Sequence, residues 1–213
     1  MRLLSRIFIA KNLEKENTFS IIYTKGEKMT GKLFIISGSS GVGKGTLIKE
    51  FLKQAQDISL SVSSTTRNPR PGEVHGVNYF YTTQEDFEKD IASGAFLEWA
   101  EFGGNRYGTN KNRVQEMLNS GKNVLLEIEV QGAKQVKEKM PEAVSIFILP
   151  PSKEELENRL RGRKTETEEA IQKRLKAIEF ETKESVHYDF QVVNDVIERA
   201  VAEIINIYEK NRG

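Results

Sequence analysis

The stretch that decides the fold is Leu33-Phe34-Ile35-Ile36-Ser37, followed at once by Gly38-Ser39-Ser40-Gly41-Val42-Gly43-Lys44-Gly45-Thr46. An apolar run, a glycine-rich segment and then a helical pattern predict a buried strand, a tight loop and a helix. Backbone N–H groups of such a loop meet at a helix N-terminus and bind phosphate, while the lysine reaches the outer phosphates of a nucleotide. A plain Gly/Ser turn is the alternative, and the flanking strand and helix favour the phosphate loop.

Gly45 and Thr46 depart from the common form of this loop, which has Ser or Thr directly after the lysine as a magnesium ligand. Magnesium gives up its waters reluctantly. We therefore expect Mg²⁺ to be held mainly by the nucleotide's phosphates and by water, with Thr46 or Glu127 nearby.

Composition restricts the class of protein. The 213 residues predict one domain with appendages, or at most two small domains. The 32 basic and 31 acidic side chains give a net charge of +1, so we expect neither nucleic-acid nor membrane-surface binding. The absence of cysteine excludes disulfides and thiolate zinc sites. No apolar run approaches the length of a transmembrane helix, and the chain is predicted to be soluble and cytoplasmic.

Residues 1–29 are predicted to be an N-terminal extension. Arg6 interrupts any signal-peptide core, and Glu14 and Glu16 argue against a transit peptide. The segment 29–33 resembles a natural beginning just before the first strand. We interpret residues 1–28 as a nonessential extension or an upstream start, weakly ordered unless residues 19–23 dock.

Strand-like and helix-like stretches alternate along the chain. Strands that are nearly continuous in Val, Ile, Leu and Phe predict a parallel sheet covered on both faces, and the alternation predicts a doubly wound α/β fold. Ligands of such sheets bind beyond the carboxyl ends of the strands. The predicted strands are 33–37, 77–81, 124–128, 144–149 and 190–193; the predicted helices are 44–56, 84–93, 111–120, 131–139, 153–161, 166–185 and 196–208.

The region from residue 61 to 107 interrupts this pattern with short strands, glycines and aromatic residues. Arg67 and Arg70 flank a proline-stiffened turn, and two guanidinium groups suit a phosphate. Tyr79 and Tyr107 add hydroxyl donors. The alternative, for an isolated Arg-x-Pro-Arg, is a surface loop with solvated arginines.

Taken in order, the motifs of residues 32 to about 210 resemble the guanylate kinase family. Besides the glycine loop, they are the Ser-Val-Ser-Ser-Thr-Thr-Arg-x-Pro-Arg-x-Gly-Glu stretch at 61–73, Glu98-Trp99, Tyr107-Gly108-Thr109 and Gly-Arg-x-Thr-Glu-Thr-Glu at 162–168. The resemblance implies a P-loop nucleotide kinase that transfers the γ-phosphate of ATP to GMP, as a monomer or homo-oligomer. It implies a core (30–60, 110–150 and 175–213), a small mixed GMP-binding subdomain (61–109) and a helical lid (151–174).

The resemblance also assigns the GMP site. Arg67, Arg70, Tyr79 and Tyr107 would hold the phosphate, while Glu98 would accept from the guanine ring N–H and amine, with Ser63 and Thr109 reading the remaining edge. An acceptor-only carboxylate suits the two adjacent donors of guanine, and against adenine it would be left unpaired. Without the motif, a solvated helix-end acid is the better interpretation of Glu98.

Glu127 and Glu129 stand where the family usually has aspartates, at the carboxyl end of a buried strand. Strand alternation predicts that both side chains share one face. One is expected to orient magnesium water and the other to meet guanine or an arginine. Charges at an exposed strand end are the alternative.

The predicted lid, residues 151–174, resembles that of the family. The resemblance implies that Arg159, Arg163 and Arg174 close over the triphosphate, where cations neutralise the transferring group. Arg161 is expected to stay exposed, and Asn194 would contact the adenine of ATP. A protein-binding module without catalysis is the alternative from another class, and it has no need of Gly41, Gly43 and Lys44 with a full arginine set. A kinase for AMP or UMP is disfavoured by Glu98.

Overall fold

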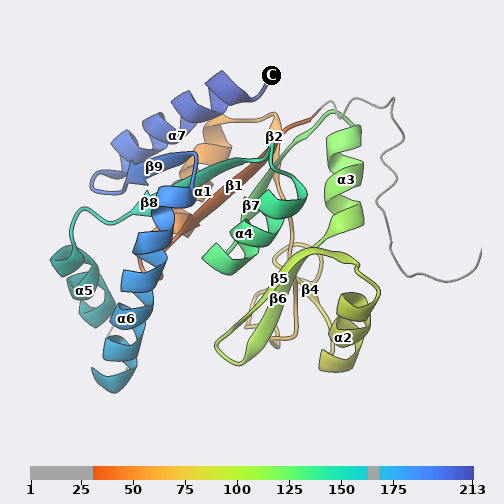
Figure 1. Ribbon diagram of the computed structural model, residues 1–213, viewed down its shortest axis with the longest axis horizontal. Coiled ribbons are helices and arrows are strands. Elements are labelled where there is room, and N and C mark those ends of the chain that lie inside the picture. The colour runs from red at the N-terminus through yellow and green to blue at the C-terminus, as the bar shows by residue number, and fades with distance from the viewer. Residues whose placement is uncertain (1–30, 163–167) are drawn as a thin grey trace, which may run out of the picture.

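The computed structural model describes residues 31–162 and 168–213 (Figure 1). The predicted extension, residues 1–29, therefore lies outside the described residues. The central feature is a five-stranded sheet in the order β2-β7-β1-β8-β9, in which every neighbouring pair is parallel. Its strands are β1 (Leu33–Gly38), β2 (Ile58–Leu60), β7 (Asn123–Glu127), β8 (Val144–Leu149) and β9 (Phe190–Val193).

Four helices cover this sheet: α1 (Lys44–Gln54) and α7 (Ile197–Asn211) on one face, α3 (Lys111–Asn119) and α4 (Val130–Lys139) on the other. The side chains of β1 alternate between the two cores. Phe34 and Ile36 pack with α1 and α7, whereas Leu33 and Ile35 pack with α3 and α4. Both faces of the strand are apolar because both are buried. The predicted α/β fold, with a central parallel sheet flanked by helices, is confirmed.

A second, mixed sheet lies between β2 and α3 in the sequence, with the order β4-β3-β6-β5. Only its β3–β4 pair is parallel. The helix α2 (Gln84–Ala92) packs on it through Phe87, whose ring stacks on Phe96 with centroids 4.5 Å apart. The strands are β3 (Ser64–Thr65), β4 (Phe80–Tyr81), β5 (Phe96–Phe102) and β6 (Asn105–Asn110).

The predicted strand at 77–81 is wrong over its first part, because strand β4 comprises only Phe80–Tyr81. The N–H groups of Val77 and Asn78 both donate to the carbonyl of Val74, at 3.2 and 3.0 Å. The side chain of Asn78 accepts from the N–H of Val74 in return. Residues 74–78 therefore form a turn, and the apolar and aromatic residues at 77–81 give no sign of it in the sequence.

Two further helices, α5 (Lys153–Gly162) and α6 (Glu168–Glu184), project from the main sheet as a pair (Figure 1). They share a small core of Leu156, Ile171, Leu175 and Ile178. The predicted lid, residues 151–174, comprises α5 and the first part of α6. A 3₁₀ turn, η1 (Ser185–His187), follows α6. Within the two described stretches, no helix combines the length and apolar character needed to cross a bilayer.

Candidate active site

The loop between β1 and α1 has the shape that the glycine-rich sequence predicts. Gly43 precedes α1 in the left-handed region, with φ of 96°, and a Cβ there would lie 2.7 Å from Nδ2 of Asn194. Asn194, just beyond β9, donates to the carbonyl of Val42 at 2.7 Å. The amine of Lys44 donates to the carbonyl of Gly38 at the start of the loop. The loop thus ends at a helix N-terminus, where free backbone N–H groups favour phosphate.

Two polar residues of the predicted phosphate loop, Ser39 and Thr46, lie in different surroundings. Ser39 is fully buried near the carboxylate of Glu181 in α6, whose pKa burial raises while Ser39 opposes the rise. Thr46 lines a separate hollow between α1 and α7, together with Ile197 and Val201. The cavity that Lys44 enters is a different one. Of the other predicted loop residues, Ser40 and Gly41 lie between β1 and α1, and Gly45 lies in the first turn of α1.

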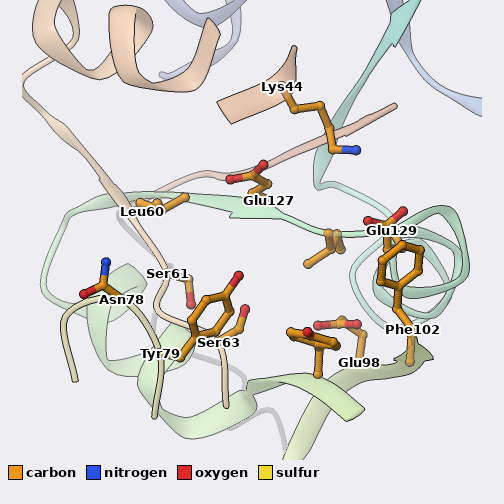
Figure 2. Close-up of a pocket in the computed structure, with 13 residues that line it drawn as sticks. Lys44, Leu60, Ser61, Ser63, Asn78, Tyr79, Glu98, Phe102, Glu127 and Glu129 are labelled. Carbon is orange, nitrogen blue, oxygen red and sulfur yellow. The ribbon is translucent and has the colours of Figure 1, made fainter. Parts of the chain in front are cut away.

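The cavity that Lys44 enters has a volume of about 290 Å³. It lies between the glycine-rich loop of residues 38–46 (the P-loop), the carboxyl end of the main sheet and the small sheet. Figure 2 shows Lys44 and Glu127 on one side of it and Glu98, Ser63 and Tyr79 on the other. Residues from five separate stretches of sequence, at 44, 60–63, 78–79, 98–107 and 127–129, therefore meet in one space. Of the predicted residues, seven line it: Lys44, Ser63, Tyr79, Glu98, Tyr107, Glu127 and Glu129.

Glu98 is the buried carboxylate of this cavity. It lies in β5 and is 4% exposed, so the interpretation as a solvated helix-end acid is excluded. The hydroxyl of Thr109, itself buried in β6, donates to Oε1 of Glu98 at 2.5 Å. Burial raises the pKa of Glu98 to about 7, against the opposing effects of Thr109 and the cation of Lys139. An ionised Glu98 keeps acceptor capacity for a ligand with adjacent N–H donors.

Arginine and tyrosine side chains gather at the Tyr79 side of the cavity. The guanidinium of Arg67 lies 5.4 Å from the ring centroid of Tyr79, whose ring is 5.9 Å from that of Tyr107. Glu73 accepts two hydrogen bonds from Nη2 of Arg67, at 2.9 and 3.0 Å. Arg70 is exposed, and its backbone N–H donates to Glu73. The structure thus brings Arg67, Tyr79 and Tyr107 together, with Arg70 at the exposed edge.

Glu127 and Glu129 both line the cavity, but Ile128 between them lines it too, and β7 ends at Glu127, so strand alternation does not account for the placement of Glu129. Glu127 is the last residue of β7, and Glu129 precedes α4 as its N-cap. The hydroxyl of Ser37 donates to the carbonyl of Ile128 between them, at 2.8 Å. Burial raises the pKa of Glu127, while the cation of Lys44 opposes the rise. Among the described residues, no group of three or more acids, histidines or cysteines is arranged to hold a metal ion.

The structure places two of the three predicted lid arginines. Arg159 lies in α5 and Arg174 in α6, whereas Arg163 is outside the described residues. Arg161 is exposed, as predicted, and pairs with Glu157 at 2.7 Å and with Glu168. It is therefore held on the surface of the helix pair.

Comparisons with known proteins identify the family. The family model described as guanylate kinase matches residues 30–211. The chain belongs to the guanylate kinase family. It is 54% identical over 176 residues to a guanylate kinase of Prochlorococcus marinus subsp. pastoris, covering 83% of this chain and 96% of that protein. It is 52% identical to a guanylate kinase of Clostridioides difficile, covering 85% of this chain and 90% of that protein. The crystal structure of guanylate kinase from Anaplasma phagocytophilum is similar, with a TM-score of 0.70, 34% identity and coverage of 87% and 88%.

The cavity of this guanylate kinase family member also has walls that the sequence interpretation misses. They are Leu60, Ser61, Asn78, Ala100, Phe102 and Ile128. Ala100 and Phe102 carry a signal, because they continue the period of two that begins at Glu98 in β5. Asn78 carries none, because its position depends on the turn at Val74.

Proposed function

We infer that the chain is an enzyme that transfers the γ-phosphoryl group of ATP to GMP, giving ADP and GDP. Family membership and identities of 50–54% to curated guanylate kinases over most of their length support this activity. One observation carries the assignment of the site. A P-loop lysine, Lys44, and a buried carboxylate, Glu98, face the same cavity from opposite sides.

In the proposed reaction, ATP lies in the P-loop, residues 38–46, and GMP under the small sheet of residues 61–109. Ionised Glu98, positioned by Thr109, accepts from the ring N–H and the exocyclic amine of guanine, and Ser63 reads the remaining edge. Arg67, Arg70, Tyr79 and Tyr107 bind the phosphate of GMP. That phosphate is already ionised at neutral pH, so the chain needs no general base to activate it.

Lys44 and the lid arginines Arg159, Arg163 and Arg174 are proposed to neutralise the transferring group, in which negative charge is spread over three oxygens. Closure of the lid, residues 151–174, over the core (30–60, 110–150 and 175–213) excludes water, which would otherwise hydrolyse ATP. Asn194, which already binds the P-loop, is proposed to lie beside the adenine of ATP.

The acids at the end of β7 fit a magnesium ion that accompanies ATP. Carboxylate oxygens suit Mg²⁺, and Glu127 faces the cavity beside Lys44, whereas Gly45 offers no hydroxyl and Thr46 lines another hollow. Glu127 would therefore orient the ion's waters, with Glu129 toward guanine or an arginine. When bound, Mg²⁺ would offset part of the phosphate charge. We also propose a cytoplasmic enzyme with small-molecule partners only, which the near-balanced net charge supports.

The test is ADP formation from ATP and Mg²⁺ with GMP, AMP, UMP or no acceptor. Fast turnover with GMP alone is expected, and Lys44→Ala should abolish it while the circular dichroism spectrum stays unchanged. A folded wild-type protein that binds GMP but forms no ADP would instead indicate a protein-binding module. Normal turnover by Lys44→Ala would refute the phosphate role of that lysine.

A further inference from the structure

Strand β5 is an edge strand of the small sheet, and α4, which covers one face of the main sheet, packs against it (Figure 1). An edge strand leaves alternate backbone groups without a strand partner. Side chains of α4 supply such partners on both sides of Glu98. Before it, the amine of Lys139 donates to the carbonyl of Leu97 at 2.5 Å.

After Glu98, the side chain of Gln135 binds both backbone groups of Trp99. Its Nε2 donates to the Trp99 carbonyl at 2.7 Å, and its Oε1 accepts from the Trp99 N–H at 3.2 Å. One side-chain amide thereby makes the pair of hydrogen bonds that a residue of a neighbouring strand would make. Because Trp99 directly follows Glu98, this clamp fixes the peptide that carries the carboxylate.

Gly132 lies three residues before Gln135, on the same side of α4. A Cβ at Gly132 would lie 2.3 Å from Oε2 and 3.0 Å from Cδ of Glu98, which is closer than side chains approach. The carboxylate therefore lies directly against the helix. Thr109 holds its other oxygen, Oε1, from β6.

We propose that Gln135 and Gly132 of α4 are positioning residues for base recognition. Gln135 holds the backbone of β5 against α4, and Gly132 leaves the space into which the carboxylate of Glu98 fits. Together they set the direction in which that carboxylate meets the two N–H donors of guanine. This inference rests on the proposed role of Glu98 as the group that reads guanine.

The test compares GMP with IMP, whose base lacks the exocyclic amine. The ratio of the two kcat/KM values, measured at pH 8 with saturating ATP, does not depend on how much of a preparation is folded. Gln135→Leu removes both hydrogen bonds to Trp99, and the preference for GMP over IMP is expected to fall about tenfold. The KM for ATP should stay within about twofold of the wild-type value. Gln131→Leu, the same change at an exposed site of α4, is the matched control and should keep the wild-type ratio.

Gly132→Ala supplies an independent variant, because alanine favours a helix and the change disturbs only the space beside Glu98. It is expected to lower the same ratio about tenfold. Suppose that Gln135→Leu and Gly132→Ala both keep the wild-type ratio of kcat/KM for GMP to that for IMP, while Glu98→Gln loses the preference for GMP. That result would overturn the positioning role and leave the proposed function standing. Equal loss in Gln131→Leu would also overturn the positioning role. A wild-type enzyme that does not phosphorylate GMP, or a Glu98→Gln variant that keeps the preference, would refute the proposed function itself.

Discussion

The side-chain amide of Asn194 donates a 2.7 Å hydrogen bond to the carbonyl of Val42, 152 residues earlier in the chain. The end of β9 thereby supports the middle of the P-loop. Gly43, directly after Val42, has no side chain to obstruct this contact. The P-loop is therefore shaped by a residue just beyond the last strand as well as by its own glycines.

Replacing Asn194 should weaken ATP binding selectively. Asn194→Ala removes the donor from a buried carbonyl, and an unsatisfied buried group costs about 1–3 kcal/mol. We expect the KM for ATP to rise about tenfold while the KM for GMP changes little. Steady-state kinetics with each substrate varied in turn measure both constants. Asp195→Asn, at the exposed neighbouring residue, is the control. Equal rises in both constants would contradict an effect of Asn194 confined to the P-loop.

The pH dependence of GMP use should report the ionisation of Glu98. Its pKa is about 7, so acidification protonates the carboxylate and removes its capacity to accept two N–H bonds. We expect the ratio of kcat/KM for wild type to that for Glu98→Gln to fall about tenfold from pH 8 to pH 6. The phosphate of GMP titrates equally in both proteins and cancels. A flat ratio would contradict ionised Glu98 as the base-reading group.

The same carboxylate should make the folded protein less stable as the pH rises from acid to neutral. Burial raises its pKa from 4.5 to about 7, so the folded state binds more protons than the unfolded state between these values. Stability of the wild type therefore falls as pH rises through this window, by about 3 kcal/mol in total. Glu98→Gln lacks this slope. Urea unfolding measures the free energy of unfolding of both proteins. The value for Glu98→Gln minus that for the wild type should be larger at pH 8 than at pH 4.5 by about that amount. A constant difference would argue against the raised pKa.

How much the sequence predicts depends on the length of each element. The main sheet is predictable because its strands β1, β7, β8 and β9 are four to six residues long and nearly all apolar. The strands β3 and β4 have two residues each, which is too short for any period to show. Their positions follow from pairing across the small sheet, which is a tertiary effect.

The candidate site also has a part that the sequence predicts and a part that it does not. Lys44 and Glu98 belong to contiguous motifs, so their side chains were predictable as parts of one site. The clamp that Gln135 forms on Trp99, and the support that Asn194 gives Val42, join residues far apart in sequence. No local pattern distinguishes Gln135 from any other polar residue on a helix surface. Such contacts become visible only once the packing of α4 against β5 is known.

Gly45 should tolerate alanine. Among the described residues, no atom outside the first turn of α1 lies within 4 Å of the Cβ position at Gly45, which sits in that turn. Since alanine costs less backbone entropy in a helix, Gly45→Ala is expected to stabilise the protein by about 0.5–1 kcal/mol. Thermal unfolding measures the gain, and kcat should stay within about threefold. Gly43→Ala is the contrasting variant, because its left-handed φ and the nearby Asn194 make the substitution strained. A loss of stability in Gly45→Ala would show that the space is not available.

Glu73 should affect GMP binding without the pH dependence that Glu98 confers. The backbone N–H of Arg70, the hydroxyl of Tyr81 and the guanidinium of Arg67 hold the pKa of Glu73 at about 2. The carboxylate therefore stays ionised from pH 5 to pH 9 and keeps Arg67 beside Tyr79 throughout. Glu73→Gln leaves a weaker, neutral partner for Arg67, and we expect the KM for GMP to rise about fivefold to tenfold.

That rise should be the same at pH 6 and pH 8, because the lost charge does not titrate in this range. Glu88→Gln is the matched control, since Glu88 pairs with Arg106 on the exposed side of α2. Its KM for GMP should stay at the wild-type value. An effect of Glu73→Gln that vanished at pH 6 would mean that Glu73 titrates near neutrality, contrary to the four hydrogen bonds that it accepts from Arg67, Arg70 and Tyr81.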